Sequence, residues 1–82
     1  MLEKMNAPIC VLVAFLEKTV MPLTFQWEKK KYPVDKINLV HSSRVGKDKW
    51  YYFSVSSENN FFKLAFNTEN NKWFLQEVFY GS

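Results

Sequence analysis

The sequence predicts a mainly β protein, a six-stranded antiparallel meander bent into a roll or a small open barrel. Apolar and polar residues alternate over most of the chain after residue 22, with the period of a half-buried strand. Aromatic residues, which favour pleated sheets, make up 18% of the 82 residues. Short connections rich in Asn and Lys separate the apolar runs and are typical of hairpins. The length fits one small domain over residues 1–82.

The first element lies in a continuous apolar run over residues 9–16. Its β-branched residues Ile9, Val11 and Val13 favour a strand that is buried on both faces, ending before Pro22. The alternative is a helix over residues 7–18 packed on a five-stranded sheet. That alternative rests on apolar residues at helical spacing: Leu2, Met5, Ile9, Leu12 and Leu16.

The next two strands follow from alternation with a period of two. Leu23, Phe25 and Trp27 share one face of a strand, and we expect all three to point inward. A further strand covers residues 32–39, but its apolar register slips by one residue midway. A slip of this kind predicts a β-bulge near Asp35-Lys36, because one extra residue exchanges the two faces.

The last three strands, over residues 50–55, 61–66 and 73–80, carry apolar residues on both faces. A sheet with one wet face does not have this pattern, so something must cover the second face. The second face can be covered in three ways: the sheet curls into a barrel, the N-terminal segment packs across it, or another chain does. We therefore predict a homodimer, formed face to face or through an edge strand such as the last one. The candidate interface residues are Trp50, Tyr52, Phe61, Phe74 and Tyr80.

Catalytic and metal-binding patterns are nearly absent, and the sequence predicts no enzyme and no cofactor. The single Cys10 and the single His41 exclude an intramolecular disulfide and a Cys/His zinc site. His41 and its neighbour Ser42 point to opposite faces of a strand, so they form no catalytic pair, and His41 is expected to be solvated. Cys10 lies in the apolar run and is expected to be buried as a small apolar side chain.

The net charge of +3 is spread over both halves of the chain, whereas nucleic-acid binders usually concentrate basic residues. A single-stranded nucleic-acid-binding β domain is nevertheless the alternative function, because aromatic residues alternate with Lys. Its candidate contacts are Lys29, Lys30, Lys31, Lys47, Lys49 and Trp50. The eight-residue apolar run is too short to span a bilayer and is a poor signal peptide, which predicts no membrane partner and a cytoplasmic location.

Several short motifs resemble a group of small uncharacterised bacterial β-rich proteins. They are Val11-x-Val13-x-Phe15, then Pro22-x-x-Phe25-x-Trp27, then Tyr32-x-Val34. The resemblance covers about residues 11–40 and implies a strand over residues 9–17, but it implies no activity. The group favours glycine in its first two turns, where this chain has Lys18-Thr19 and Lys29-Lys30. The sequence thus predicts a small non-enzymatic binding or assembly module that self-associates.

Overall fold

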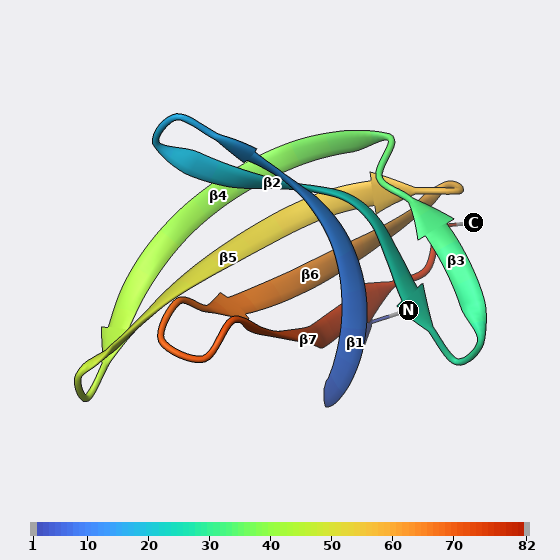
Figure 1. Ribbon diagram of the computed structural model, residues 1–82. Helices are drawn as coiled ribbons and strands as arrows, with labels where there is room; N and C mark the ends of the chain where they lie inside the picture. The colour runs from blue at the N-terminus through green and yellow to red at the C-terminus, as the bar shows by residue number, and fades with distance from the viewer. Residues whose placement is uncertain (1, 82) are drawn as a thin grey trace.

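The structure is a computed structural model that describes residues 2–81. These residues form one antiparallel sheet of seven strands in the order β3-β2-β1-β7-β6-β5-β4, and they contain no helix (Figure 1). The strands are β1 (Leu2–Leu16), β2 (Thr19–Trp27), β3 (Lys30–Pro33), β4 (Lys36–Val45), β5 (Asp48–Ser57), β6 (Asn60–Asn67) and β7 (Lys72–Phe79). The mainly β prediction is confirmed, and the N-terminal segment is a strand.

The predicted number of six strands is wrong, because residues 32–39 do not form one bulged strand. They divide into β3 and β4, which lie at opposite edges of the sheet. Pro33 has no N–H to donate to a sheet ladder and ends β3. The apparent slip of register near Asp35-Lys36 is therefore a crossing between the two edges, and a register shift lies slightly later, in β4 between Ile37 and Leu39.

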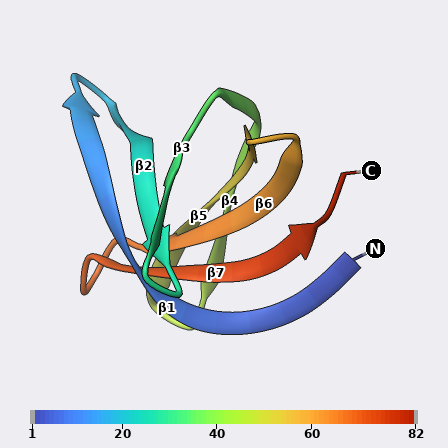
Figure 2. The same ribbon diagram turned by 90° about the vertical axis from the view of Figure 1, so that its right-hand side faces the viewer.

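The sheet curls into a half-barrel whose concave face holds the core (Figure 2). Phe25 from β2 and Tyr32 from β3 meet Phe62 of β6 across this face, with ring centroids 5.0 and 5.2 Å apart. The aromatic-rich composition thus lets side chains from distant strands fill the space inside the curl. The buried core cluster comprises Phe25, Phe53, Val55, Phe62, Leu64, Phe66, Trp73, Leu75 and Val78.

At one end of the half-barrel, the crossing between β3 and β4 joins the two halves of the sheet. The Val34 N–H donates to the Leu23 carbonyl (2.9 Å), and the next N–H, of Asp35, donates to the Ser56 carbonyl (2.8 Å). The Asp35 carboxylate in turn accepts a hydrogen bond of 3.1 Å from the Glu58 N–H. The backbone of two consecutive residues, Val34 and Asp35, is thus hydrogen-bonded to β2 and β5, which lie four strands apart in the sheet.

Register shifts place two residues, Leu23 and Tyr80, on other faces of the sheet than predicted. Leu23 was expected inside with Phe25, but it is 42% exposed, because the β1–β2 register shifts there and Pro22 takes the inner place opposite Val13. In β7, a shift after Leu75 changes the faces of the residues that follow. Tyr80 consequently packs against the core instead of sharing a face with Phe74. The last strand is also an inner strand, between β1 and β6, and offers no free edge.

The hairpin turns contain left-handed residues that are not glycine. Asn59 and Asn71 have φ values of 66° and 59°, as expected if Asn replaces glycine in tight turns. The β2–β3 turn has no such residue and instead places Glu28 and Lys29 at φ 51° and 66°. The glycine-poor sequence therefore closes this hairpin at an energetic cost.

Candidate interaction surfaces

The β1–β2 hairpin extends beyond the strand that pairs with the other side of β1. Pairing between β1 and β7 ends where Ile9 lies opposite Trp73, because β7 begins at Lys72. Pairing between β1 and β2 continues to the end of β1, at Leu16 opposite Thr19. Over residues 10–16, β1 thus has a partner strand on one side only. We call residues 10–24 the apolar arm.

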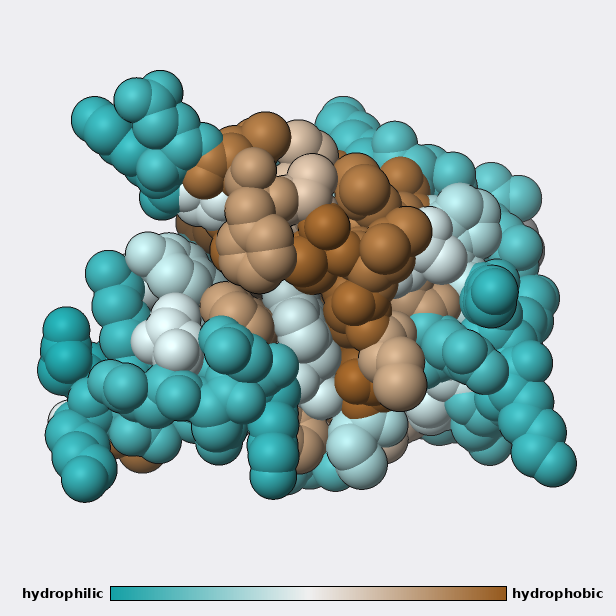
Figure 3. All heavy atoms as spheres, viewed as in Figure 1, coloured by the Kyte–Doolittle hydropathy of each residue, from teal (hydrophilic) through white to brown (hydrophobic). Residues whose placement is uncertain are grey.

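The apolar arm exposes several large hydrophobic side chains. The exposed fractions are 77% for Phe15, 64% for Leu12, 49% for Leu16 and 42% for Leu23. Figure 3 shows apolar surface along the hairpin where it crosses the front of the molecule, with a hydrophilic turn at its tip. Large apolar side chains gathered on one hairpin make this surface a candidate interaction site.

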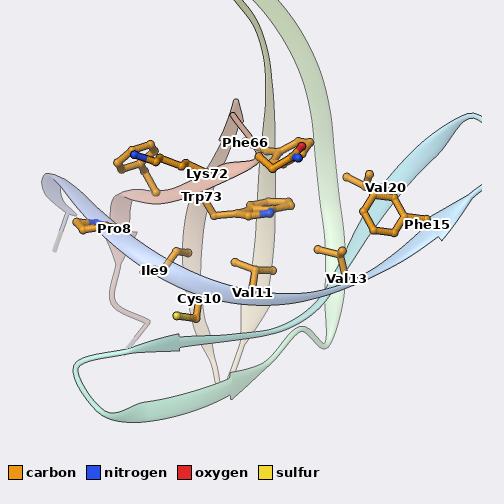
Figure 4. Close-up of a pocket in the computed structure, with 12 residues that line it drawn as sticks. Pro8, Ile9, Cys10, Val11, Val13, Phe15, Val20, Phe66, Lys72 and Trp73 are labelled. Carbon is orange, nitrogen blue, oxygen red and sulfur yellow. The ribbon is translucent and has the colours of Figure 1, made fainter. Parts of the chain in front are cut away.

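A slot of about 810 Å³ lies beside the unpaired side of β1. Ile9, Val11 and Val13 point from β1 toward Trp73, as Figure 4 shows, and Phe66 stacks on Trp73 with ring centroids 4.6 Å apart. Lys72 is the charged residue of the lining. Neither of the two ion pairs formed within residues 2–81 includes Lys72. The slot is therefore apolar along its length and basic at the side of β7.

The prediction that Cys10 is buried is wrong. Its side chain is exposed and points away from Trp73, on the other face from Val11 (Figure 4). The reason is the alternation of the strand: the concave face takes Ile9 and Val11, and within residues 2–81 no element packs on the convex face of the arm.

Three of the five predicted interface residues gather on the convex face of β5–β7. Trp50 lies 6.4 Å from Tyr52 and 5.9 Å from Phe74 between ring centroids, and these rings are half-buried. They surround Ala65, which is fully buried between Tyr52 and Phe74 in the register. Aromatic side chains thus cover much of the second apolar face within one chain.

The remaining predicted interface residues lie elsewhere. Phe61 and Phe79 lie toward the other end of the convex face, with ring centroids 6.3 Å apart. Their side chains are 49% and 48% exposed. Tyr80 belongs to the concave side. Its partial burial, and after it the negative charges of Glu3 and Glu28, raise the pKa of its hydroxyl above the usual 10.0.

His41 is exposed, as predicted, and stacks on Tyr52 with centroids 4.9 Å apart. Its neighbour Ser42 lies opposite Tyr51, on the other face of β4, so the two form no catalytic pair. Among residues 2–81, no group of three or more His, Cys, Asp or Glu side chains is arranged to hold a metal ion.

The candidate nucleic-acid contacts do not form one surface. Lys29, Lys30 and Lys31 belong to the β2–β3 hairpin, which lies on the opposite side of the molecule from the β4–β5 turn that carries Lys47 (Figure 1). Lys30 pairs with Glu58 at 2.8 Å, and the hydrogen bond to this carboxylate raises the pKa of Lys30. Lys49 lies over the Tyr51 ring at 5.1 Å, whereas Trp50 points to the other face of β5.

The unpaired side of the arm was missed by the sequence reasoning. The sequence did contain one indication of this surface: residues 5–16 form the longest stretch without a charged side chain. The absence of a partner strand depends on where β7 begins, and this is visible only when β1 and β7 are paired.

No family model, no curated protein and no solved structure matches this chain. Within residues 2–81, there is no helix of the length and apolar character needed to cross a membrane.

Proposed function

We propose that the protein is a small non-enzymatic assembly module that associates with itself through the apolar arm. The observation that carries this proposal is the exposure of Leu12, Phe15 and Leu16 on a hairpin that extends beyond its neighbouring strand. Burying such side chains between two copies stabilises the pair by removing apolar surface from water. A twofold dimer is the commonest closed assembly and lets one patch cover itself.

The arm fits a second copy better than a charged partner. Residues 10–16 and 19–24 of the arm carry no charge, and Glu17 and Lys18 at its tip have opposite charges, so two arms meet without net repulsion even though each chain has a net charge of +3. A stable specific interface buries about 800 Å² on each partner, and a projecting hairpin with its apolar slot offers both a ridge and a groove for this purpose.

Single-stranded nucleic acid is less well supported as a ligand. The Trp50–Tyr52 pair, with rings inclined by only 12°, offers aromatic surface next to Lys63, whose ammonium lies 5.4 Å from the centre of the Tyr52 ring. The other candidate lysines lie on separate hairpins, so few phosphates are contacted together. We expect binding to single-stranded DNA to be weaker than about 10⁻⁵ M at physiological salt.

The proposal is tested by light scattering after gel filtration over a tenfold dilution series. We expect a mass of twice 9.8 kDa at high micromolar concentration, falling toward the monomer on dilution. Leu12→Lys places an ammonium in the arm and should raise the dimer Kd at least about tenfold.

Leu39→Lys is the matched control. Leu39 is 58% exposed on β4, close to the 64% of Leu12, and both variants add the same charge. It should leave the dimer Kd unchanged. A monomer at all concentrations, or equal effects of the two variants, would contradict assembly through the arm.

A further inference from the structure

We infer that two copies join by pairing the unpaired side of β1, residues 10–16, antiparallel across a twofold axis at Val13. This inference rests on the proposed self-association and specifies its geometry. Edge strands present unpaired backbone N–H and C=O groups that another strand can satisfy. Here the unpaired stretch lies beside the slot of about 810 Å³, which leaves room along the edge for a second strand.

The register follows from the length of the unpaired stretch. It contains residues 10–16, and full overlap of two such stretches in antiparallel orientation places the midpoint, Val13, on the axis. Val11 of one copy then lies opposite Phe15 of the other. The side chains that point toward Trp73 in Figure 4 thus continue as one apolar face from copy to copy.

The same register brings opposite charges together at both ends of the shared ladder. Counting outward from Val13, Leu16 of one copy lies opposite Cys10 of the other, next to the Ile9–Trp73 pair at the start of β7, and the chain turns at Glu17. Glu17 therefore reaches the end of β7 where Lys72 lies. Among residues 2–81, neither Glu17 nor Lys72 takes part in an ion pair within one chain.

The β4 edge is the main competing site for strand pairing, since it is free along Lys36–Val45, whereas the β3 edge covers only Lys30–Pro33. It exposes Leu39 and Val40, but Lys36 and Arg44 lie near its ends. An antiparallel β4 pair would bring Lys36 of one copy close to Arg44 of the other, and like charges at neighbouring cross-strand positions destabilise pairing. Charge thus favours the β1 edge.

The natural Cys10 allows a direct test, because it is the single cysteine of the chain and is exposed. Spin labels attached to Cys10 report the distance between two copies by double electron–electron resonance. In the proposed register, the two Cys10 positions are offset by six residues, or about 20 Å along the strands. We expect a narrow distance distribution near that value.

A second label position separates the two edges. Ser43→Cys in a Cys10→Ser background moves the label to exposed β4. It should give a distance well above that of Cys10, whereas a β4 dimer would give the reverse order. A dimeric mass with a long Cys10 distance would overturn this inference and leave self-association standing. A monomeric mass would overturn both.

Charge reversal tests the register without labels. Glu17→Lys and Lys72→Glu should each raise the dimer Kd about fivefold, because each substitution acts twice across the axis. The double variant should return the Kd to the value of the parent protein. Additive weakening in the double variant would overturn the contact between Glu17 and Lys72, and with it this register.

Discussion

The distal half of β1 and strand β6 are both rich in apolar residues but have very different surroundings. β6 has a partner strand on each side, and its residues Leu64 and Ala65 are fully buried although they point to opposite faces. The distal half of β1 has one partner strand, and Leu12 and Phe15 are exposed. Apolar side chains are stabilised when they are buried, and the position of a strand in the sheet decides whether other strands of the same chain bury them.

The difference extends to the whole core. Within residues 2–81, the buried core cluster takes eight of its nine members from β5, β6 and β7, and Phe25 is the contribution of β2. β1 supplies residues that pack only partly against this cluster, such as Ile9 and Val11. Most of the buried core thus comes from three strands, while the arm packs against it with its inner side chains and exposes Leu12, Phe15 and Leu16.

Truncating one leucine in each region should give the largest contrast. Leu64→Ala removes a fully buried side chain and should lower the free energy of unfolding by about 3 kcal/mol. Leu12→Ala removes the same atoms from a 64% exposed site and should change it by less than about 0.5 kcal/mol in the monomer. Urea unfolding at a protein concentration below the dimer Kd measures both changes in the free energy of unfolding. Similar losses would show that the arm is part of the core.

Trp27 lies between these two extremes. Its side chain is half-buried, packs against the core, and tilts toward the Tyr32 ring at 6.2 Å. Trp27→Ala should therefore lower the free energy of unfolding by about 2 kcal/mol, less than the about 3–5 kcal/mol expected for a fully buried tryptophan. Thermal unfolding followed by circular dichroism measures the change. An unchanged melting temperature would place Trp27 outside the core.

The β2–β3 turn, next to the arm, should be improvable. Glu28 and Lys29 hold φ values of 51° and 66°, which Asn and Gly adopt at lower cost. Glu28→Asn with Lys29→Gly should raise the free energy of unfolding by about 1 kcal/mol. Gly46→Ala in the β4–β5 turn is the reverse control, because its φ of 61° disfavours a Cβ that meets no other atom within 4 Å. It should lower stability by a similar amount. A loss of stability in the Glu28→Asn/Lys29→Gly variant, or a gain in Gly46→Ala, would contradict these turn conformations.

The smallest expected effect is a loss of stability at alkaline pH. Burial raises the pKa of Tyr80 above 10.0, and the hydrogen bond with Glu58 raises that of Lys30 above 10.5. Both groups hold their protons more tightly when the protein is folded, so their contribution is complete below these values and is lost as pH rises through the folded pKa. Tyr80→Phe and Glu58→Gln should each weaken the dependence of the free energy of unfolding on pH, measured by urea unfolding from pH 9 to 12. A steeper dependence in either variant would contradict these assignments.

Local pattern determined much of this protein from the sequence. Alternation with a period of two placed strands over residues 50–55, 61–66 and 73–80, and it assigned Phe25 to an inward face, where it is buried. This succeeds because side-chain alternation is a property of each strand's own backbone. Joining consecutive strands by hairpins was likewise correct except between β3 and β4, since short turns pair sequence neighbours.

Only the tertiary structure decided the features that depend on a distant partner. The pairing of Ile9 with Trp73 joins the two ends of the chain, and it makes β7 an inner strand while leaving residues 10–16 unpaired on one side. The exposure of Leu23 and the inward position of Tyr80 depend on register shifts against neighbouring strands. Such shifts minimise the free energy of a whole curled sheet, in which non-local pairing decides which face each residue occupies.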